Sequence, residues 1–589
     1  MNALLGLIAR FGRDDRGAFA TLFGILSIVL VAVAGAVVDF TSVQQARTRA
    51  QEALDSAALS LQPEIYSETD SQIKATAQKL VVERIADKSI TVNIESVATN
   101  TTDGTLHLQA QITVPTTFVG LVGVPQIQAR LVAEATRKKL YVEVAMVLDN
   151  SGSMASYSRM DNLKTAAKNA TDILFSNQDT LPNVQVGIVP FTELVNVGTA
   201  NANASWMDRT GAAQITRDNF DDDDNHTTPF NGPVDRIALF NNFSNVSWGG
   251  CVEARKSPYD TTDDPPDSSV PDTLFTPAMM PDAPDGWSTG SGDYISDTPS
   301  QCAVLAGSCS CTTTTEPYYD RRGRLRYRTS TDCTKTLFSG GSTSGSNVCS
   351  CSSGTTTSSS SGGTTTSTIT CPYYDTGSDL PDREKQERLC KYVPGVTVNY
   401  SGFYGPNGDC PSAAILPLTN QRSPVKSEID SMVANGGTNI HEGTIWGWRV
   451  LSPGSPFTQG RAYDTATYKV IIMMTDGENT FYPNGSMNGS SLYSAYGFLY
   501  NNRLGNMGDS TSTLQADMDT KTLAACTNAK KEGVEIYTIG LQPPNTKTQT
   551  MLTNCATDAS HAYFPSDPSQ LDAVFQDIAT KISRLRLAQ

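Results

Sequence analysis

The feature that most constrains this 589-residue chain is an uncharged apolar segment near its N-terminus. Residues 18–38 read AFATLFGILSIVLVAVAGAVV, and a helix of this length, rising about 1.5 Å per residue, crosses a hydrocarbon core of about 30 Å. The segment is longer than the apolar part of a signal peptide, and no small-residue cleavage site closes it. We therefore expect a retained single-pass anchor; the alternative is a buried core helix.

Charges around the segment indicate its orientation only modestly. Arg10, Arg13 and Arg16 precede it and Asp39 follows it, as the positive-inside rule requires for a cytoplasmic N-terminus, although two more arginines lie not far beyond. We expect residues 1–17 to form a cytoplasmic tail. The anchor then spans the inner (cytoplasmic) membrane, and the bulk of the chain is periplasmic or extracellular.

Cysteine usage supports this orientation more strongly. The chain has 12 cysteines, ten of them between Cys251 and Cys410 in loop-rich sequence, and such an even, clustered set is typical of disulfides formed outside the reducing cytosol. Zinc is the alternative. The sequence disfavours it because its four histidines are scattered and its closest cysteine pairs, such as Cys309 and Cys311, are tighter than usual zinc-ligand spacings.

The acidic balance excludes one class of partner. A formal net charge of −16 and a pI near 4.8 argue against nucleic acid, because nonspecific affinity for it comes from neutralising phosphates with Lys and Arg. Cations suit the chain better than polyanions.

The apolar helix is predicted to continue beyond the membrane segment to about Leu61, on a stripe of three-and-four spacing: Ala46, Ala50, Ala53, Leu54, Ala57, Ala58 and Leu61. Residues 62–137 then predict a small α+β module, with a helix over 69–86 and strands near 90–97, 105–113 and 127–135. A long half-membrane helix backed by a small sheet is pilin-like in outline.

Beyond residue 137 the pattern changes to strands alternating with helices, which predicts a doubly wound, largely parallel α/β sheet over residues 138–197 and 412–589. The expected strands are 142–148, 184–190, 469–475 and 534–540. The expected helices are 162–175, 443–451, 514–531 and a final helix whose apolar face includes Phe575 and Ile578.

Residues 198–411 interrupt this domain as a long Cys-rich and Ser/Thr/Gly-rich insertion. We expect the tract 339–367 not to order itself, because it has little apolar surface to bury. A short repeat, in which a Cys-Ser-Cys and a Tyr-Tyr-Asp occur twice, predicts a duplicated disulfide-stapled hairpin or loop on the domain surface. The acidic run 221–224 is expected to be a solvated loop, with calcium binding as a minor option.

The segment VLDNSGSM places a carboxylate and two hydroxyls, Asp149, Ser151 and Ser153, directly after the first strand, where open α/β sheets bind ligands. Neither a phosphate loop nor a hydrolase elbow has enough of its glycines here. A hard divalent cation fits better, because Mg²⁺ prefers oxygen ligands. A helix cap alone explains the triplet equally well.

Two later segments favour the cation. Thr438 lies at the start of a helix and offers a hydroxyl. Asp476 follows the apolar strand 469–475 and offers a second carboxylate at the same edge of the sheet.

At these residues the sequence resembles a von Willebrand factor type A (vWA) domain with a complete metal-ion-dependent adhesion site. The resemblance covers about 138–197 and 412–589, and implies a Rossmann-like α/β fold. It implies that Mg²⁺ or Mn²⁺ is held by the serines and Thr438, with one or both of Asp149 and Asp476 acting through water. The open coordination position would accept an acidic side chain of a protein ligand.

The first 60 residues resemble the TadG-like proteins of tight-adherence (Flp) pilus systems, in which a membrane-anchored region precedes a type A domain. Arg16-Gly17 before the apolar helix and Asp39 after it carry this resemblance. Prepilins have a Glu five residues after the cleaved Gly, whereas this chain has Leu22, so a retained anchor is expected. The implied function is pilus assembly, anchoring or adhesion, with pilus components or a surface receptor as partners.

Three further expectations complete the sequence reading. Cys526 and Cys555 flank the strand 534–540 and predict a disulfide, with two buried thiols as the alternative. A structural minor pilin-like subunit, whose metal only stabilises the fold, is an alternative function. A serine hydrolase that uses Ser151, His441 and Asp476 is a remote one; we expect no enzyme activity.

Overall fold

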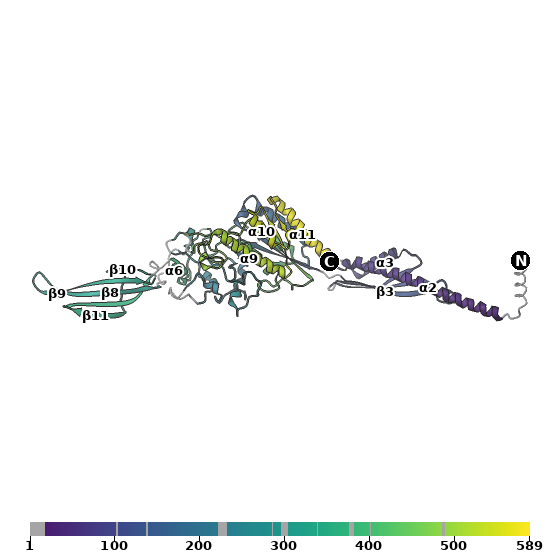
Figure 1. Cartoon of the computed structure of the whole chain (residues 1–589), viewed down its shortest axis with the longest axis horizontal. Coiled ribbons are helices and arrows are strands. Elements are labelled where there is room, and N and C mark those ends of the chain that lie inside the picture. The colour runs from purple at the N-terminus through teal and green to yellow at the C-terminus, as the bar shows by residue number, and fades with distance from the viewer. Residues whose placement is uncertain are drawn as a thin grey trace. The chain divides into compact units, whose positions relative to one another are not determined.

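The structure is a computed structural model, and it describes residues 18–588 except 67, 102–103, 137–139, 222–231, 285–286, 296–303, 339, 376–381, 401 and 486–488. The expected cytoplasmic tail and most of the acidic run thus lie outside the described residues. The chain divides into two compact units, one mainly of Met1–Leu140 and the other of Tyr141–Leu587 (Figure 1). We call them unit 1 and unit 2 and describe each by itself.

Unit 1 is built on one long helix, α2 (Ala18–Leu61), as the continuous apolar stripe predicts. Its N-terminal part is long and apolar enough to cross a membrane. Most described side chains of that part are not covered by the rest of the protein. The part beyond Asp39 buries the predicted alanine and leucine stripe against the rest of the unit. One helix therefore has two environments, with the change near Asp39.

A second helix and a three-stranded sheet cover this buried stripe. Helix α3 (Asp70–Ile85) begins at a capping box made by Thr69 and Gln72. Strands β1 (Thr91–Asn100), β2 (Thr105–Pro115) and β3 (Gln126–Thr136) pair antiparallel in chain order. Both α2 and α3 pack on the sheet, whose central strand β2 buries every second residue. The predicted helix and strands of this module are confirmed to within a few residues.

Unit 2 contains a mixed sheet with the strand order β16-β15-β14-β4-β5-β6-β7. Its parallel centre consists of β4 (Tyr141–Asp149), β5 (Val184–Phe191), β14 (Thr467–Thr475), β15 (Glu535–Gly540) and β16 (Ala562–Tyr563). Three short strands add to it antiparallel, β6 (Val195–Asn196), β7 (Cys251–Val252) and β13 (Leu416–Thr419). The predicted parallel α/β fold is confirmed.

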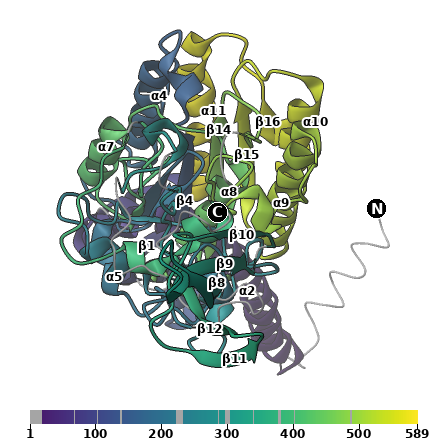
Figure 2. The same ribbon diagram turned by 90° about the vertical axis from the view of Figure 1, so that its left-hand side faces the viewer.

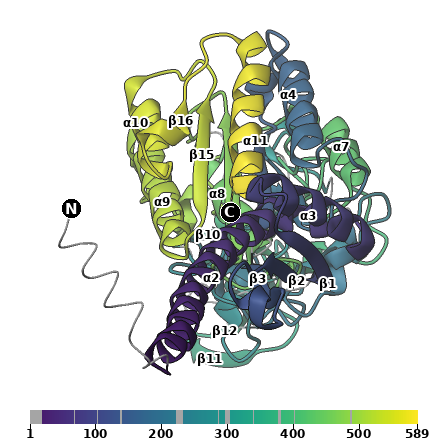
Figure 3. The same ribbon diagram turned by 90° about the vertical axis from the view of Figure 1, so that its right-hand side faces the viewer.

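Helices cover both faces of this sheet, and as a result every residue of β4 after Tyr141 is buried. Figures 2 and 3 show α9 and α10 on one side of β15, and α4 and α7 on its other side. The bounds are α4 (Arg159–Leu174), α7 (Arg422–Ser431), α8 (Ile440–Leu451), α9 (Thr511–Lys531), α10 (Thr546–Cys555) and α11 (Leu571–Ala588).

Helix α8 is buried along its whole length. It lies directly on the sheet because Gly443 and Gly447 face it: a Cβ added to them would lie 2.7 Å from Phe191 and 2.5 Å from Val147. The two tryptophans of this helix, Trp446 and Trp448, are core residues. Close packing of α8 fixes the loop before it, which carries Thr438.

Much of residues 198–411 packs into the core of unit 2. Aromatic side chains from this region share one apolar cluster with α8, namely Trp206, Phe220, Phe240, Phe243, Trp248 and Phe275. Two short helices, α5 (Arg236–Asn241) and α6 (Asp382–Glu387), lie in it. A disulfide joins Cys251 and Cys410. It ties strand β7, which begins at Cys251, to the C-terminal end of the region 198–411.

The rest of the region forms a second sheet of five antiparallel strands in the order β10-β9-β8-β12-β11, which we call the outer sheet. Its strands are β8 (Val304–Tyr319), β9 (Leu325–Leu337), β10 (Ser342–Gly345), β11 (Thr355–Ser361) and β12 (Thr364–Asp375). The prediction that residues 339–367 do not order themselves is therefore wrong.

The sheet is ordered although it has almost no apolar core, because its threonine and serine side chains favour and stabilise paired strands. Threonine is β-branched and favours extended backbone, and cross-strand hydroxyl pairs stabilise a sheet. Such pairs occur between Thr312 and Thr368 at 2.9 Å and between Thr313 and Thr331 at 3.0 Å.

Disulfides supply the remaining order and reveal what the sequence repeat does. The second cysteine of each Cys-Ser-Cys closes its own repeat, in Cys311–Cys333 and Cys351–Cys371, whereas the first cysteines join the two repeats, in Cys309–Cys349. The predicted stapled duplication thus folds as one sheet, not as two separate hairpins. Among the described residues no cysteine is free.

Candidate metal centre

The predicted oxygen donors meet at the carboxyl edge of the sheet in unit 2. Strands β4 and β14 are adjacent and parallel, so the residues that follow them come together. Asp149 ends β4, and Asp476 follows Thr475, the last residue of β14. The Thr475 hydroxyl donates to Asp149 Oδ2 at 2.7 Å, which connects the two strand ends directly.

A continuous chain of hydrogen bonds links four of the five predicted donors. The Ser151 N–H donates to Asp149 Oδ1 at 2.8 Å, and the hydroxyls of Ser151 and Ser153 lie 3.0 Å apart. The Ser153 hydroxyl donates to Asp476 Oδ1 at 2.6 Å. The short 3₁₀ helix η3 (Gly152–Ala155) turns the backbone here, so both serines face the same space as the carboxylates.

The fifth donor, Thr438, is held beside this chain by backbone contacts. The Gly152 N–H donates to Gly436 O at 3.0 Å, so the loop before α8 lies against the serine loop. The Thr438 N–H donates to Thr480 Oγ1 at 2.7 Å, which ties it to the loop after β14. A Cβ added to Gly477 would lie 3.7 Å from the Thr438 hydroxyl oxygen, so this hydroxyl lies beside the residue that follows Asp476.

The electrostatics of the site favour an added positive charge. Asp149 is fully buried, and burial together with the nearby negative charge of Asp476 raises its pKa to about 7. A bound cation would reverse this effect, because it stabilises both carboxylates in their charged form.

One residue of the site was missed by the sequence reading. Arg159, at the start of α4, pairs with Asp476 Oδ2 at 2.7 Å and also donates to Gln542 at 3.0 Å. Its guanidinium lies over the ring of the exposed Tyr157. Arg159 therefore compensates one of the two carboxylates, while Asp149 has only uncharged hydrogen-bond donors in contact.

The donor set fits a hard divalent cation. It consists of two carboxylates and three hydroxyls, all oxygen, as Mg²⁺ and Mn²⁺ prefer. An open cavity of about 480 Å³, lined by Tyr157, Arg159, Asn162, Gln542, Asp567 and Ser569 among others, lies beside Arg159. Exposed Ser153 and this cavity leave room for a further ligand at the edge of the site.

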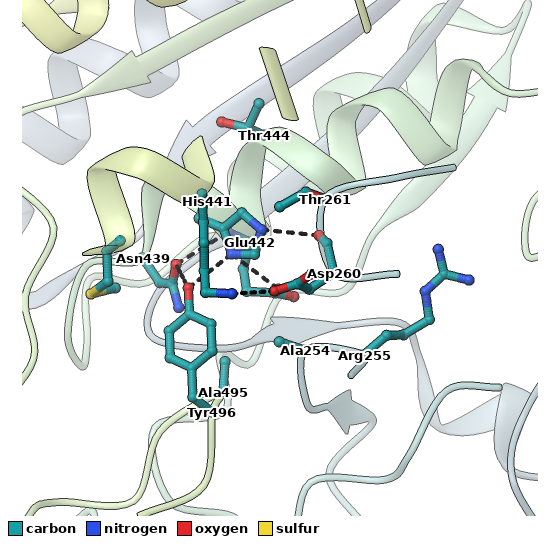
Figure 4. A network of polar contacts seen from close by, with 12 residues as sticks. Ala254, Arg255, Asp260, Thr261, Asn439, His441, Glu442, Thr444, Ala495 and Tyr496 are labelled. Atoms are coloured by element: carbon teal, nitrogen blue, oxygen red, sulfur yellow. Dashed lines mark hydrogen bonds and ion pairs between the residues drawn. The ribbon is translucent and has the colours of Figure 1, made fainter. Parts of the chain in front are cut away.

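The proposed hydrolase triad is contradicted by the position of His441. Its ring nitrogens contact Tyr496 Oη at 2.8 Å and Asp260 O at 3.0 Å (Figure 4). Burial lowers its pKa to about 4. His441 is thus occupied by other partners within a buried network, and the hydroxyl of Ser151 contacts Ser153, not His441.

The cysteines lie apart from these donors. Cys526 of α9 and Cys555 of α10 are joined by a disulfide inside the core of unit 2. The sulfurs of Cys309, Cys311 and Cys351 lie within 4.8 Å of one another, but each is in a disulfide, so they are not available as metal ligands.

Comparisons with known proteins match two parts of the chain. Residues 17–61 match the family described as putative Flp pilus-assembly TadE/G-like. No curated protein matches the sequence.

The chain also matches solved structures at low identity and with low TM-scores. The pilus adhesin SpaC from Lactobacillus rhamnosus GG is 11% identical with a TM-score of 0.29; the match covers 84% of this chain and 35% of the adhesin. This chain thus spans about a third of that protein. The vWF domain of the type V pili tip protein Mfa5 from Porphyromonas gingivalis is 10% identical, with a TM-score of 0.30 and coverage of 76% and 96%.

A third similar structure is proximal thread matrix protein 1 from the mussel byssus with a zinc-occupied MIDAS motif. It is 18% identical with a TM-score of 0.18, and the match covers 28% of this chain and 31% of that protein. The segment that matches the TadE/G-like family model thus precedes the α/β unit whose strand order and donor positions are described above.

Proposed function

We propose that this chain is a membrane-anchored cell-envelope protein of a Tad/Flp-type pilus system. It binds a protein ligand through a divalent cation held by Asp149, Ser151, Ser153, Thr438 and Asp476. Mg²⁺ or Mn²⁺ held there would accept an acidic side chain of the ligand as a further oxygen ligand. The biological role is assembly or anchoring of the pilus, or adhesion itself, and the chain has no catalytic activity.

One observation carries this proposal: the Ser153 hydroxyl, 2.6 Å from Asp476, joins donors that are more than three hundred residues apart in sequence. The match of residues 17–61 to the TadE/G-like family supports the pilus system, and the span in α2 supports a single-pass membrane anchor. Ten cysteines in disulfides between described residues support a bulk outside the cytosol.

The proposal is tested by the metal dependence of filament binding. Full-length protein is immobilised in detergent, and filaments purified from the same cells are applied with Mg²⁺ or with EDTA. We expect binding in Mg²⁺ that EDTA and Thr438→Ala abolish. The matched control, Thr520→Ala, removes an exposed hydroxyl that bonds only its own helix, and should bind as wild type does. Binding that is equal in EDTA contradicts the proposal.

A second candidate function is a structural minor subunit of the filament. The long helix α2 backed by the small sheet of unit 1 favours it, because this outline is pilin-like. The two candidates differ in location. A minor subunit co-purifies with sheared filaments, whereas an assembly or anchoring protein stays with the inner membrane fraction.

A further inference from the structure

We propose that the loop between β2 and β3 of unit 1, residues 116–124, enters the bilayer beside α2 and forms a second membrane contact. This inference rests on the proposed membrane anchor. It adds that the anchor is a helix and a loop together, and that the loop lies in lipid hydrocarbon on the Asp39 side of the span.

The first observation is the composition and exposure of the loop. Its sequence, TTFVGLVGV, has no charged residue. Three of its apolar side chains project from the protein: Leu121 is 82% exposed, Val122 is 67% exposed and Val124 is 43% exposed. Single exposed apolar residues are common, but a contiguous group at one loop tip marks an interaction surface.

The second observation is where the loop lies along α2. A Cβ added to Gly35 would meet Phe118 at 2.4 Å, so helix and loop are in direct contact there. Further towards the N-terminus, a cavity of about 340 Å³ has walls that include Ile28, Val31 and Ala32 of the helix and Leu121 and Val122 of the loop. The loop therefore runs along the helix towards its N-terminus and lies beside the apolar segment itself.

This position sets the depth of the loop. At about 1.5 Å per residue, Ile28 lies about 15 Å from Val38, the last residue of the apolar segment. The hydrocarbon core is about 30 Å thick, and nearly the whole segment 18–38 is needed to cross it. If the helix crosses the bilayer, the tip of the loop beside Ile28 is below the membrane surface.

The third observation is that most backbone N–H groups of the loop have hydrogen-bond partners in unit 1, which lowers the cost of placing the loop in hydrocarbon. The Asp39 carboxylate accepts the N–H groups of Thr117, Phe118 and Val119 at 3.0, 2.7 and 2.7 Å. These bonds also tie the loop to the helix at the point where the apolar segment ends.

The remaining turns of the loop close on themselves. The Leu121 N–H donates to Phe118 O at 3.1 Å, and the Val124 N–H donates to Val119 O at 3.2 Å. The Thr116 N–H donates to Pro125 O at 3.0 Å, and its hydroxyl donates to Val124 O. A water-exposed loop does not require this, because water satisfies free N–H groups.

The experiment measures depth with a fluorescent label. Full-length protein carrying one added cysteine, Leu121→Cys, is labelled with a nitrobenzoxadiazole dye without reduction, because no described native cysteine is free. It is reconstituted in phosphatidylcholine and phosphatidylglycerol vesicles that contain nitroxide lipids. Val29→Cys marks the span itself, and Asn100→Cys marks the opposite end of the sheet.

We expect lipid nitroxides to quench the label at positions 29 and 121 several-fold more than at position 100, and aqueous iodide to show the reverse order. If position 29 is quenched but position 121 behaves like position 100, the loop is in water and this inference is wrong, although the anchor stands. If position 29 also escapes quenching, the anchor itself fails.

A protein occupant gives a different result. A label at position 121 that is shielded from both iodide and lipid nitroxides, and that crosslinks to a second protein, overturns the inference in favour of a filament neighbour.

Discussion

The two sheets of unit 2 are stabilised in opposite ways. The main sheet buries successive apolar residues of β4 and β14, and helices cover both its faces. The outer sheet exposes most of β9 and all of β11, and its order comes from backbone pairing, hydroxyl pairs and three disulfides. A chain can thus place a rigid site at the edge of one sheet and carry a second sheet with almost no core. The two should respond differently to the same kinds of change.

The largest difference is expected from deleting a buried side chain. Ile471 is fully buried between β4, β15 and α8, so Ile471→Ala should lower the free energy of unfolding of unit 2 by about 2–5 kcal/mol. The matched change in the outer sheet, Ile369→Ala, removes a half-buried side chain and should cost less than about 1 kcal/mol. Chemical denaturation of full-length protein measures both. Equal costs would mean that the outer sheet has a core of its own.

Removing a disulfide should have the opposite effect: it should disturb the outer sheet more than the main sheet. By chain entropy, the Cys311–Cys333 link, with a sequence separation of 22, and the Cys526–Cys555 link, with a separation of 29, each contribute about 3–4 kcal/mol. We expect the double Ser variant at 311 and 333 to lose amide protection throughout β8 and β9, because no apolar cluster replaces the link. The double Ser variant at 526 and 555 should keep protection in β14 and β15. Retained protection in β8 and β9 would contradict this account.

The buried His441 gives the main sheet a pH dependence between pH 7 and pH 4 that no histidine supplies in the outer sheet. Its pKa falls to about 4 in the folded protein because burial disfavours its charged form, so the unfolded state binds its proton first. Stability from this group is therefore complete above pH 6.5 and is lost as pH falls towards 4. The loss is about 2 kcal/mol between pH 7 and pH 5.

The measurement compares unfolding of wild type and His441→Gln at both pH values. Asp260, Lys521, Arg449 and Glu442 also face this ring and remain in both proteins. The wild type should lose more stability than the variant on acidification. An equal loss would assign the acid sensitivity to these neighbours.

The smallest effect is expected for a hydroxyl pair of the outer sheet. Thr313→Val removes the bond to Thr331 and keeps the β-branched shape, so the cost should be about 0.2–1 kcal/mol. Protection of β8 and β9 by hydrogen exchange is the readout. A cost above that of Ile369→Ala would show that hydroxyl pairs, more than disulfides, order this sheet.

The sequence predicted the parts of the fold that depend on apolar periodicity. The bounds of α2, the three strands of unit 1 and the parallel strands of unit 2 follow from it, because a repeated burial pattern is local information. The outer sheet could not be predicted in this way. Its order comes from pairing between distant Ser/Thr segments, which leaves no apolar signal in the sequence.

The five oxygen donors of the candidate site could also be predicted from local sequence, whereas Arg159 could not. Asp149, Ser151 and Ser153 are one local motif, and Thr438 and Asp476 lie at predictable element ends. Arg159 was missed because its role depends on the side-chain direction at the start of α4, which brings it to Asp476 only in three dimensions. The remote hydrolase alternative used His441, because a sequence position near Thr438 does not tell which way the ring points.

The central claim is that the edge of the main sheet holds a divalent cation. Differential scanning calorimetry of full-length protein in detergent, with and without Mg²⁺ or Mn²⁺, tests it most directly. A ligand that binds only the native state raises stability by about 2.7 kcal/mol at a hundred times its Kd.

We predict a higher unfolding temperature for unit 2 of the wild type and of Asp179→Ala, an exposed aspartate outside the site. We predict no metal-dependent change for Asp149→Ala. No shift in the wild type, or the same shift in Asp149→Ala, would contradict the account.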